Sequence, residues 1–332
     1  MRAFDKQRAD AAAVTAGARV RARSSGPQHH RADQAAHAIT FLFAASIIFV
    51  TGLLFYELYT GALPTRSKFG WWRFLSGTTW DPVSLEFGAL PFIYGTLVTS
   101  ALALIIGVPL GVGASIFLAE LAPLKLSNAL AFIIELLAAV PSVIYGLLAI
   151  FTLVPFVRDY ISPILKSTLG FLPIFQGPAY GVSFLAGGCI LAIMVIPFII
   201  SISREVLLAV PREQREASLA LGATRWETAW LVVMPYARSG IIGSVFLALA
   251  RALGETMAVT MVIGNDPRIK MSLFAPGYSI AAVIANEFSE ATSGIHTSAL
   301  IELGFVLFCI TILVNAFARV LILAMERKNS AA

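Results

Sequence analysis

The chain has 332 residues, of which 58% are apolar and 13% are charged, and its formal net charge is +5. The charged share is about half of the roughly 25% that is usual in a soluble domain. Such a chain cannot cover a water-facing surface, which excludes an ordinary soluble enzyme, a nucleic-acid-binding protein and a disordered tail. A lipid bilayer is therefore the expected environment for most of the chain.

Residues 1–37 are rich in Ala and Arg, and the run Ser24-Ser25-Gly26-Pro27 interrupts any helix. We expect a flexible basic tail on the cytoplasmic side, close to anionic lipid. A transit peptide is the alternative interpretation. The adjacent His29 and His30 have no cysteine or carboxylate cluster beside them, so neither a metal site nor a cofactor is predicted.

Six apolar segments are long enough to cross a bilayer, because a spanning helix needs about 20 mostly apolar residues. They are 38–59, 92–121, 128–155, 183–203, 239–263 and 299–321. The first is too long for the core of a signal peptide and is expected to remain as an anchor. The alternating pattern of a membrane barrel is absent, so each span must satisfy its own backbone as a helix. The predicted fold class is an all-α integral membrane protein with a transmembrane domain over 38–325.

Glycine and proline predict interruptions inside three of these spans. The run from Gly107 to Gly113 is either a hinge or a site of close helix packing, and packing is favoured because glycine lets helices approach. Pro141 and Pro197 each remove a backbone donor and are expected to kink or break their helices.

The distribution of Lys and Arg predicts that both termini are cytoplasmic. The segments that would then lie inside carry thirteen Lys and Arg residues and are 18–37, 122–127, 204–238 and 319–332. The segments that would lie outside carry seven and are 60–91, 156–182 and 264–298. Five aromatic side chains after span one are expected to form an interfacial belt: Phe69, Trp71, Trp72, Phe74 and Trp80.

The cytoplasmic loop 204–238 contains a predicted helix, a bend and a second helix. Pro211 suits the first position of a helix over 212–221, in which Arg212 and Glu216 are spaced to pair. Gly222 is expected to end that helix in a left-handed conformation. The run Thr224-Arg225-Trp226-Glu227 then supplies a capping box for a second helix that stops near Pro235.

This loop has two interpretations on physical grounds. Ala217, Ala220 and Leu221 leave a face of small residues that another protein can approach closely. An amphipathic hairpin lying on lipid is the alternative.

The same loop resembles the EAA signature of ABC importer permeases. Glu216-Ala217-Ser218, three residues, Gly222, nine residues, Val232, one residue and Met234-Pro235 keep the spacing of that signature. Ser218, Val232 and Met234 depart mildly from its Ala, Ile and Leu. The resemblance implies that the loop is a coupling helix that inserts into a separate ATPase subunit. The residues assigned to this coupling are Glu216, Ala217, Ser218, Ala220, Leu221, Gly222, Thr224 and Arg225.

The chain has no Gly-x-x-x-x-Gly-Lys-Ser/Thr phosphate loop. It is therefore expected to have no ATPase site of its own, and the resemblance implies a transport subunit without catalytic residues. Its energy must come from a partner or from a gradient.

Four ionisable residues fall within or near the predicted spans, where a charge costs about 2.5–3.5 kcal/mol on insertion scales. Arg251 and Glu255 are four apart and expected on one helix face. They are either a structural pair or a pathway site in which Arg251 binds an oxyanion and Glu255 is its counter-ion. Glu135 either pairs with Arg251 or extends to the interface, and Glu302 is expected to reach the headgroups.

Two segments resemble the PstC-type permease subunits of phosphate importers: Arg251 to Val259 and Ala138 to Leu147, the latter containing Ser142 and Tyr145. The resemblance covers roughly 38–325. It implies a type I ABC importer permease fold (MetI-like) in a bacterial inner membrane, with ATP-driven transport of phosphate by alternating access. It also implies a heterodimer with a PstA-type permease, two PstB-type ATPases and a periplasmic PstS-type receptor.

The residues themselves leave alternatives open. The hydroxyls of Ser142 and Tyr145 face either a cavity or a helix-packing contact. A permease for sulfate, molybdate or another oxyanion shares the coupling loop, and a gradient-driven secondary transporter is a further possibility. An intramembrane enzyme has no supporting motif.

Overall fold

The structure is a computed structural model that describes residues 27–330. Most of the predicted basic tail, residues 1–26, therefore lies outside the described residues. The chain divides into two compact units, residues 1–57 and 58–332. The described part of the first unit belongs to helix α2 (Pro27–Gly61), which begins upstream of the predicted start of span one at residue 38.

The second unit contains the remaining helices and one minimal hairpin. After α2, the elements before the third span are α3 (Leu63–Phe69), α4 (Trp71–Ser76), β1 (Trp80–Asp81), β2 (Glu86–Phe87), α5 (Leu90–Ile116) and α6 (Leu124–Ala138). They are followed by α7 (Ser142–Leu148), α8 (Val154–Phe156), α9 (Ser162–Leu169), α10 (Phe184–Leu208), α11 (Arg212–Ala220) and α12 (Arg225–Thr228). The last are α13 (Met234–Leu253), α14 (Met257–Ile263), α15 (Ile280–Glu287) and α16 (Gly294–Ser330).

Shorter helical turns connect several of these helices. The π-helical turns are Phe117–Leu121, Ala149–Leu153, Val157–Ile161 and Ala229–Val233, and a 3-10 turn covers Pro173–Phe175. In the hairpin, Trp80 lies opposite Phe87 in antiparallel register.

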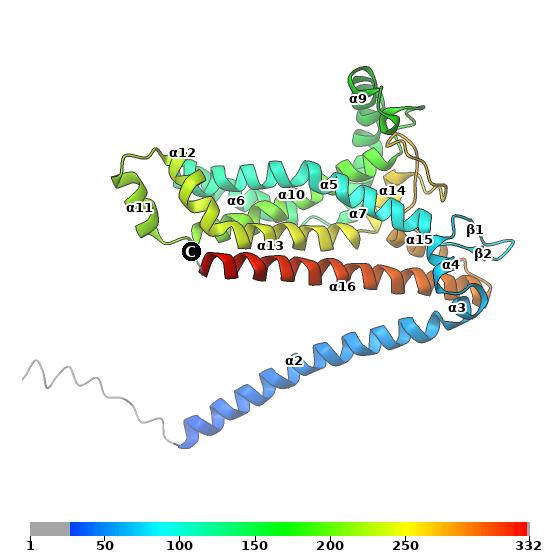
Figure 1. Ribbon diagram of the computed structural model, residues 1–332, viewed down its shortest axis with the longest axis horizontal. Coiled ribbons are helices and arrows are strands. Elements are labelled where there is room, and N and C mark those ends of the chain that lie inside the picture. Colours follow the sequence, from blue (N-terminus) through cyan, green and yellow to red (C-terminus); the bar gives the residue numbers. More distant parts are fainter. Residues whose placement is uncertain (1–26, 331–332) are drawn as a thin grey trace, which may run out of the picture. The chain divides into compact units, whose positions relative to one another are not determined.

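Within residues 27–330, six helical segments are long and apolar enough to cross a membrane, which confirms the predicted number. They are Ala36–Phe69, Leu90–Leu121, Ser142–Leu169, Phe184–Leu208, Arg225–Leu253 and Gly294–Ala324. Figure 1 shows α5, α10, α13 and α16 running side by side, with α11 and α12 at one end of this bundle. The hairpin and α3, α4 and α15 lie at the other end, which we call the hairpin end.

The predicted third and fifth spans were wrong in their boundaries. The segment 128–155 is divided at Val140 and Pro141 into α6 and α7, and the long apolar helix runs from Ser142 to Leu169. The fifth span starts earlier, at Arg225, and ends at Leu253, where Gly254 terminates the helix before α14. Apolar composition continues across the break at Pro141, so hydropathy could not locate the start of the third span.

Of the three predicted interruptions, only Pro141 breaks a helix. Helix α5 continues through the run 107–113, and α10 continues through Pro197. The predicted stop at Pro235 was also wrong, because the helix passes from a π-helical turn directly into α13. A proline can follow a wide turn of this kind, since the local hydrogen-bond register has already shifted.

Glycines allow α5 and α10 to pack closely, as favoured from the sequence. A Cβ at Gly107 would lie 3.0 Å from Val195 Cγ2, and one at Gly111 would lie 2.8 Å from Ile199 Cγ2. Helix α10 is the most buried of the six spans, so this contact lies at the centre of the second unit.

Replacing Gly111 with Ala is expected to lower the free energy of unfolding by about 1–3 kcal/mol, the usual cost of overpacking. The matched control is Gly113 on the same helix, where a Cβ would meet nothing within 4 Å. Gly113→Ala should leave stability unchanged or raise it by up to about 1 kcal/mol, because alanine favours the helix. Unfolding of the purified protein in detergent measures both changes, and equal effects of the two substitutions would contradict the packing argument.

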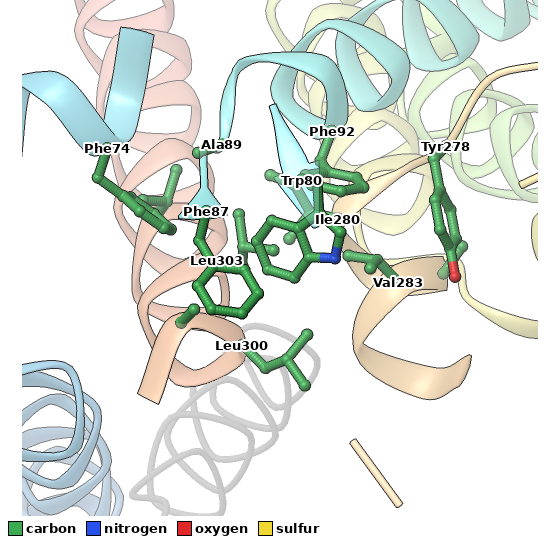
Figure 2. Packing of buried hydrophobic residues seen from close by; sticks show 13 residues of the cluster. Phe74, Trp80, Phe87, Ala89, Phe92, Tyr278, Ile280, Val283, Leu300 and Leu303 are labelled. Atoms are coloured by element: carbon green, nitrogen blue, oxygen red, sulfur yellow. The ribbon is translucent and has the colours of Figure 1, made fainter. Parts of the chain in front are cut away.

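The hairpin end is held by an aromatic cluster. Figure 2 shows Trp80 between Phe87 and Phe92, with ring centroids 4.7 and 4.8 Å from that of Trp80. The Trp80 indole N–H donates to Glu287 Oε2 at 2.9 Å. Phe74 and Trp80 are therefore core residues, and the predicted interfacial belt was wrong for them, whereas Trp72 is exposed.

A buried ion pair joins α3 to α16 at this end. Arg66 Nε donates to Glu302 Oε1 at 2.8 Å, and Glu302 is completely buried. The expectation that Glu302 reaches lipid headgroups was therefore wrong. Its partner lies 236 residues away in the sequence, and the Thr65 hydroxyl, which donates to Ser298 Oγ at 2.9 Å, strengthens the same contact.

Candidate functional site

The loop between α10 and α13 folds as a helical knob at the end of the bundle opposite the hairpin (Figure 1). Gly222 has φ of +90°, the left-handed conformation predicted for the end of α11. Thr224 and Glu227 form the predicted capping box at the start of α12. Both features follow from local chemistry, which is why the sequence identified them.

The side chains assigned to coupling are mostly exposed on this knob. The exposed ones are Glu216, Ala217, Ala220, Leu221, Gly222, Thr224 and Arg225. Leu221, 90% exposed, stands at the tip beside Gly222. Ser218 is only half-buried, and its hydroxyl lies 3.0 Å from that of Thr228, so it links α11 to α12 within the knob. An exposed apolar tip on an ordered bend is suited to docking against another surface.

The predicted pair of Arg212 and Glu216 is replaced by a different ion pair. Both of those side chains are exposed, whereas Arg215 forms a two-pronged contact with Glu120 after α5, at 2.8 and 3.1 Å. Sequence reasoning missed both members. Glu120 offered a signal, because it is the first charged residue after an uncharged stretch that begins beyond Glu86.

The resemblance of this loop to the EAA signature implies that replacing Gly222 with Val uncouples ATP hydrolysis from transport in an assembled complex. A β-branched residue at positive φ raises the conformational free energy by about 1–2 kcal/mol. The backbone would therefore leave this conformation, and the angle between α11 and α12 would change. The space around Gly222 is open, with nothing within 4 Å of a Cβ, so the effect arises from the backbone alone. Asn tolerates this conformation, and Gly222→Asn is the matched control that should retain coupling. The measurement is substrate transported per ATP hydrolysed, and normal coupling in the Val variant would contradict the prediction.

Two broken helices meet inside the second unit. The first break separates α6 from α7 at Val140 and Pro141, and the second separates α13 from α14 at Gly254. Helix α7 packs directly on α14, because a Cβ at Gly146 would lie 3.0 Å from Ala258 Cα. The breaks lie directly before the span Ser142–Leu169 and directly after the span Arg225–Leu253. Discontinuous helices of this kind are typical of substrate sites in transporters.

Four of the five predicted pathway residues lie at or near these breaks, and Glu135 does not. Tyr145 donates its hydroxyl to Leu137 O at 2.8 Å, across the first break. Ser142, half-buried, begins α7 on the same side. Arg251 is exposed in the last turn of α13, and its guanidinium carbon lies 5.9 Å from the centroid of the Phe198 ring.

The expected pairing of Arg251 with Glu255 was wrong. Gly254 ends α13, so Glu255 lies in the break and does not share a helix face with Arg251. Its Oε1 accepts a hydrogen bond from the Ala258 N–H at 3.3 Å and so supports the start of α14. Among the ion pairs of residues 27–330, none involves Arg251 or Glu255.

Glu135 lies apart from Arg251. It is exposed on α6 and lines a small cavity with Arg204 and Glu205. Of the two alternatives for Glu135, the ion pair with Arg251 is not formed in the part of the chain that the structure describes.

The loop between α14 and α15 closes over the start of α10. The N–H groups of Phe184 and Leu185 donate to Ala275 O and Leu273 O at 3.0 and 2.9 Å. Within this loop, Arg268 and then Lys270 hold the pKa of Asp266 well below its usual range by hydrogen bonding to its carboxylate. The loop is thus a charged, ordered cover over one end of α10.

Comparison with known proteins identifies relatives along most of the chain. Residues 111–330 match the family described as "Binding-protein-dependent transport system inner membrane component". The chain is 45% identical over 303 residues to the phosphate transport system permease protein PstC of Mesorhizobium japonicum, covering 90% of this chain and 92% of that protein. It is 51% identical over 260 residues to the protein of the same name from Xylella fastidiosa, covering 77% and 80%.

Two solved structures share the fold. A chain of a bacterial alginate ABC transporter in complex with its periplasmic protein aligns with a TM-score of 0.56 at 15% identity, covering 89% of this chain and 96% of that one. A chain of the inward-facing MetNI methionine ABC transporter aligns with a TM-score of 0.51 at 16% identity, covering 74% and 99%. At these identities the likeness concerns the fold alone.

Proposed function

We propose, since this chain belongs to the family of binding-protein-dependent transport system inner membrane components, that it is the PstC-type permease subunit of an ATP-driven phosphate importer. The observation that carries the proposal is 45% identity to a phosphate permease subunit over 90% of the chain. Sulfate and molybdate are not favoured, because the similarity to phosphate permeases extends along both pathway segments. The chain is a transport component of a multi-pass membrane assembly in the bacterial inner membrane.

The chain works in an assembly with other subunits. The partners are a second permease, ATPase subunits and a binding protein. We assign these partners as a PstA-type permease, two PstB-type ATPases and a periplasmic PstS-type receptor. The asymmetry of Lys and Arg orients both termini and the helical knob toward the cytoplasm. The knob then meets the ATPases, and the hairpin end faces the receptor.

The transport mechanism we assign is alternating access between the two permeases. ATP binding closes the ATPase pair and displaces α11, and the membrane-spanning helices move with α11. Arg251 is the transient ligand of the anion, because its planar fork can donate two hydrogen bonds to one oxyanion. Tyr145 and Ser142 lie at the neighbouring break and complete the polar part of the pathway.

The two carboxylates have supporting roles in this mechanism. Glu255 acts through the start of α14, where it accepts a backbone hydrogen bond, and so positions the break beside Arg251. Glu135 lies on the exposed face of α6, where the second permease can complete the pathway around it.

Co-purification and uptake together test the proposal. The chain, isolated from native membrane, should bring a second permease and a nucleotide-binding subunit with it. The complex in proteoliposomes, supplied with receptor and ATP, should import labelled phosphate, and unlabelled sulfate or molybdate should not compete. Transport by the purified chain alone would support a secondary transporter instead, and competition by sulfate would reassign the substrate.

A further inference from the structure

Arg215 connects α11 to the second and fourth membrane-spanning helices. Its Nε and Nη2 donate to the carboxylate of Glu120, with Nη2 2.8 Å from Oε1. Nη2 also donates to Leu207 O at 2.7 Å, and Nη1 donates to Val210 O. One side chain of α11 therefore contacts the π-helical turn that ends the second span and the carbonyls that end α10.

The ion pair between Arg215 and Glu120 is largely shielded from solvent, unlike an ordinary surface ion pair. The side chains of Arg215 and Glu120 are 18% and 9% exposed. All three nitrogens of the planar Arg215 guanidinium donate hydrogen bonds, so the contact fixes the orientation of the side chain as well as its distance from Glu120. A compact charge such as an ammonium group would not fix the orientation. The positive charge also lies at the C-terminal end of α10, where the helix dipole favours it.

The remaining connections of α11 to the rest of the unit are two short chain segments and a contact with the start of the fifth span. The chain passes from α10 to α11 through Ala209, Val210 and Pro211, and leaves α11 through Gly222 with an open surrounding. The Ser218 hydroxyl contacts Thr228 at the start of the fifth span, which continues into α13 rather than into α5 or α10. Without the Arg215 contact, α11 could pivot on these short linkers without moving α5 or α10.

We propose that Arg215 and Glu120 are positioning residues that transmit a displacement of α11 to α5 and α10. This inference rests on the proposed function, in which an ATPase moves α11. The neighbouring Glu216 is exposed and faces outward, so α11 presents one residue to a partner and the adjacent one to the spans.

The displacement can continue toward the pathway through close contacts. Helices α5 and α10 pack closely at Gly107 and Gly111. Helix α10 is joined to α13 by the hydroxyls of Ser203 and Ser244, 2.7 Å apart in the buried interface. Helix α13 carries Arg251 in its last turn.

The test compares coupling with assembly in the complete complex. Arg215→Gln and Glu120→Gln are measured singly and together, as phosphate imported per ATP hydrolysed in proteoliposomes with receptor. Each single change leaves one buried charge unpaired, so it also lowers the yield of assembled complex. The double change removes both charges, so we expect the yield to recover. Arg158→Gln, which opens the exposed pair of Arg158 and Asp159, is the matched control for loss of an arginine.

We expect the double variant to assemble normally and to import about tenfold less phosphate per ATP, within the usual range of coupling free energies between sites. A role limited to charge compensation would restore the ratio in the double variant, and that result would overturn the inference. An unchanged ratio in assembled Arg215→Gln would also overturn it. If the wild-type complex hydrolyses ATP but imports no phosphate, the proposed function fails, and this outcome is distinct from normal coupling in the variants.

Discussion

Replacing Arg251 with Gln is expected to lower phosphate uptake by about 100-fold while the complex still assembles. Hydrogen bonds to charged groups contribute about 1.5–3 kcal/mol each. A guanidinium fork that loses about 3 kcal/mol of interaction with a passing oxyanion changes its binding by roughly 100-fold. Arg251 is exposed on the single chain, so its replacement removes no core contact. Uptake of labelled phosphate into proteoliposomes is the measurement.

Arg251→Lys is the informative comparison for this prediction. Lys keeps the charge but cannot donate in a planar fork, so uptake should fall between those of wild type and the Gln variant. Co-purification of the ATPase subunits serves as the control for assembly. Full uptake by Arg251→Gln would remove Arg251 from the pathway and leave it a structural residue of the break.

Replacing Arg66 with Leu is expected to lower the free energy of unfolding by about 3–5 kcal/mol, because a buried charge would lose its partner. Glu302 has no exposed surface, and Arg66 is 16% exposed. The Arg66 guanidinium carbon also lies 4.4 Å from the centroid of Phe305 and 4.8 Å from that of Trp71. Unfolding of the purified protein in detergent measures the effect.

Two further variants separate the cost of an unpaired charge from the value of the pair. Arg66→Leu combined with Glu302→Leu should recover most of the lost stability. Among residues 27–330, Arg66 Nη2 and Glu302 Oε2 find no hydrogen-bond partner, so the pair is incompletely satisfied. Arg158→Leu breaks an exposed pair, with side chains 52% and 49% exposed, and should cost no more than about 1 kcal/mol. A double variant as unstable as the single one would show that the arginine packs among the aromatic rings without regard to its charge.

The features that sequence predicted well are those that depend on neighbouring residues. The number of spans follows from local hydropathy, because each span must satisfy its own backbone in lipid. The left-handed Gly222 and the Thr224–Glu227 capping box follow from conformational preference and from side chains three residues apart. The bend between α11 and α12 was therefore predictable before any tertiary contact was known.

The partners of the buried charges were decided only by tertiary packing. Glu302 pairs with Arg66, 236 residues away, and Arg215 pairs with Glu120, 95 residues away. Spacing within one segment instead suggested Arg212 with Glu216 and Arg251 with Glu255, and neither pair forms in the described chain. The physical reason is that a buried charge must meet its counter-charge wherever the helices bring one. Which helices touch depends on close approaches such as Gly111 against Ile199, a property of the packed bundle rather than of any local run of residues.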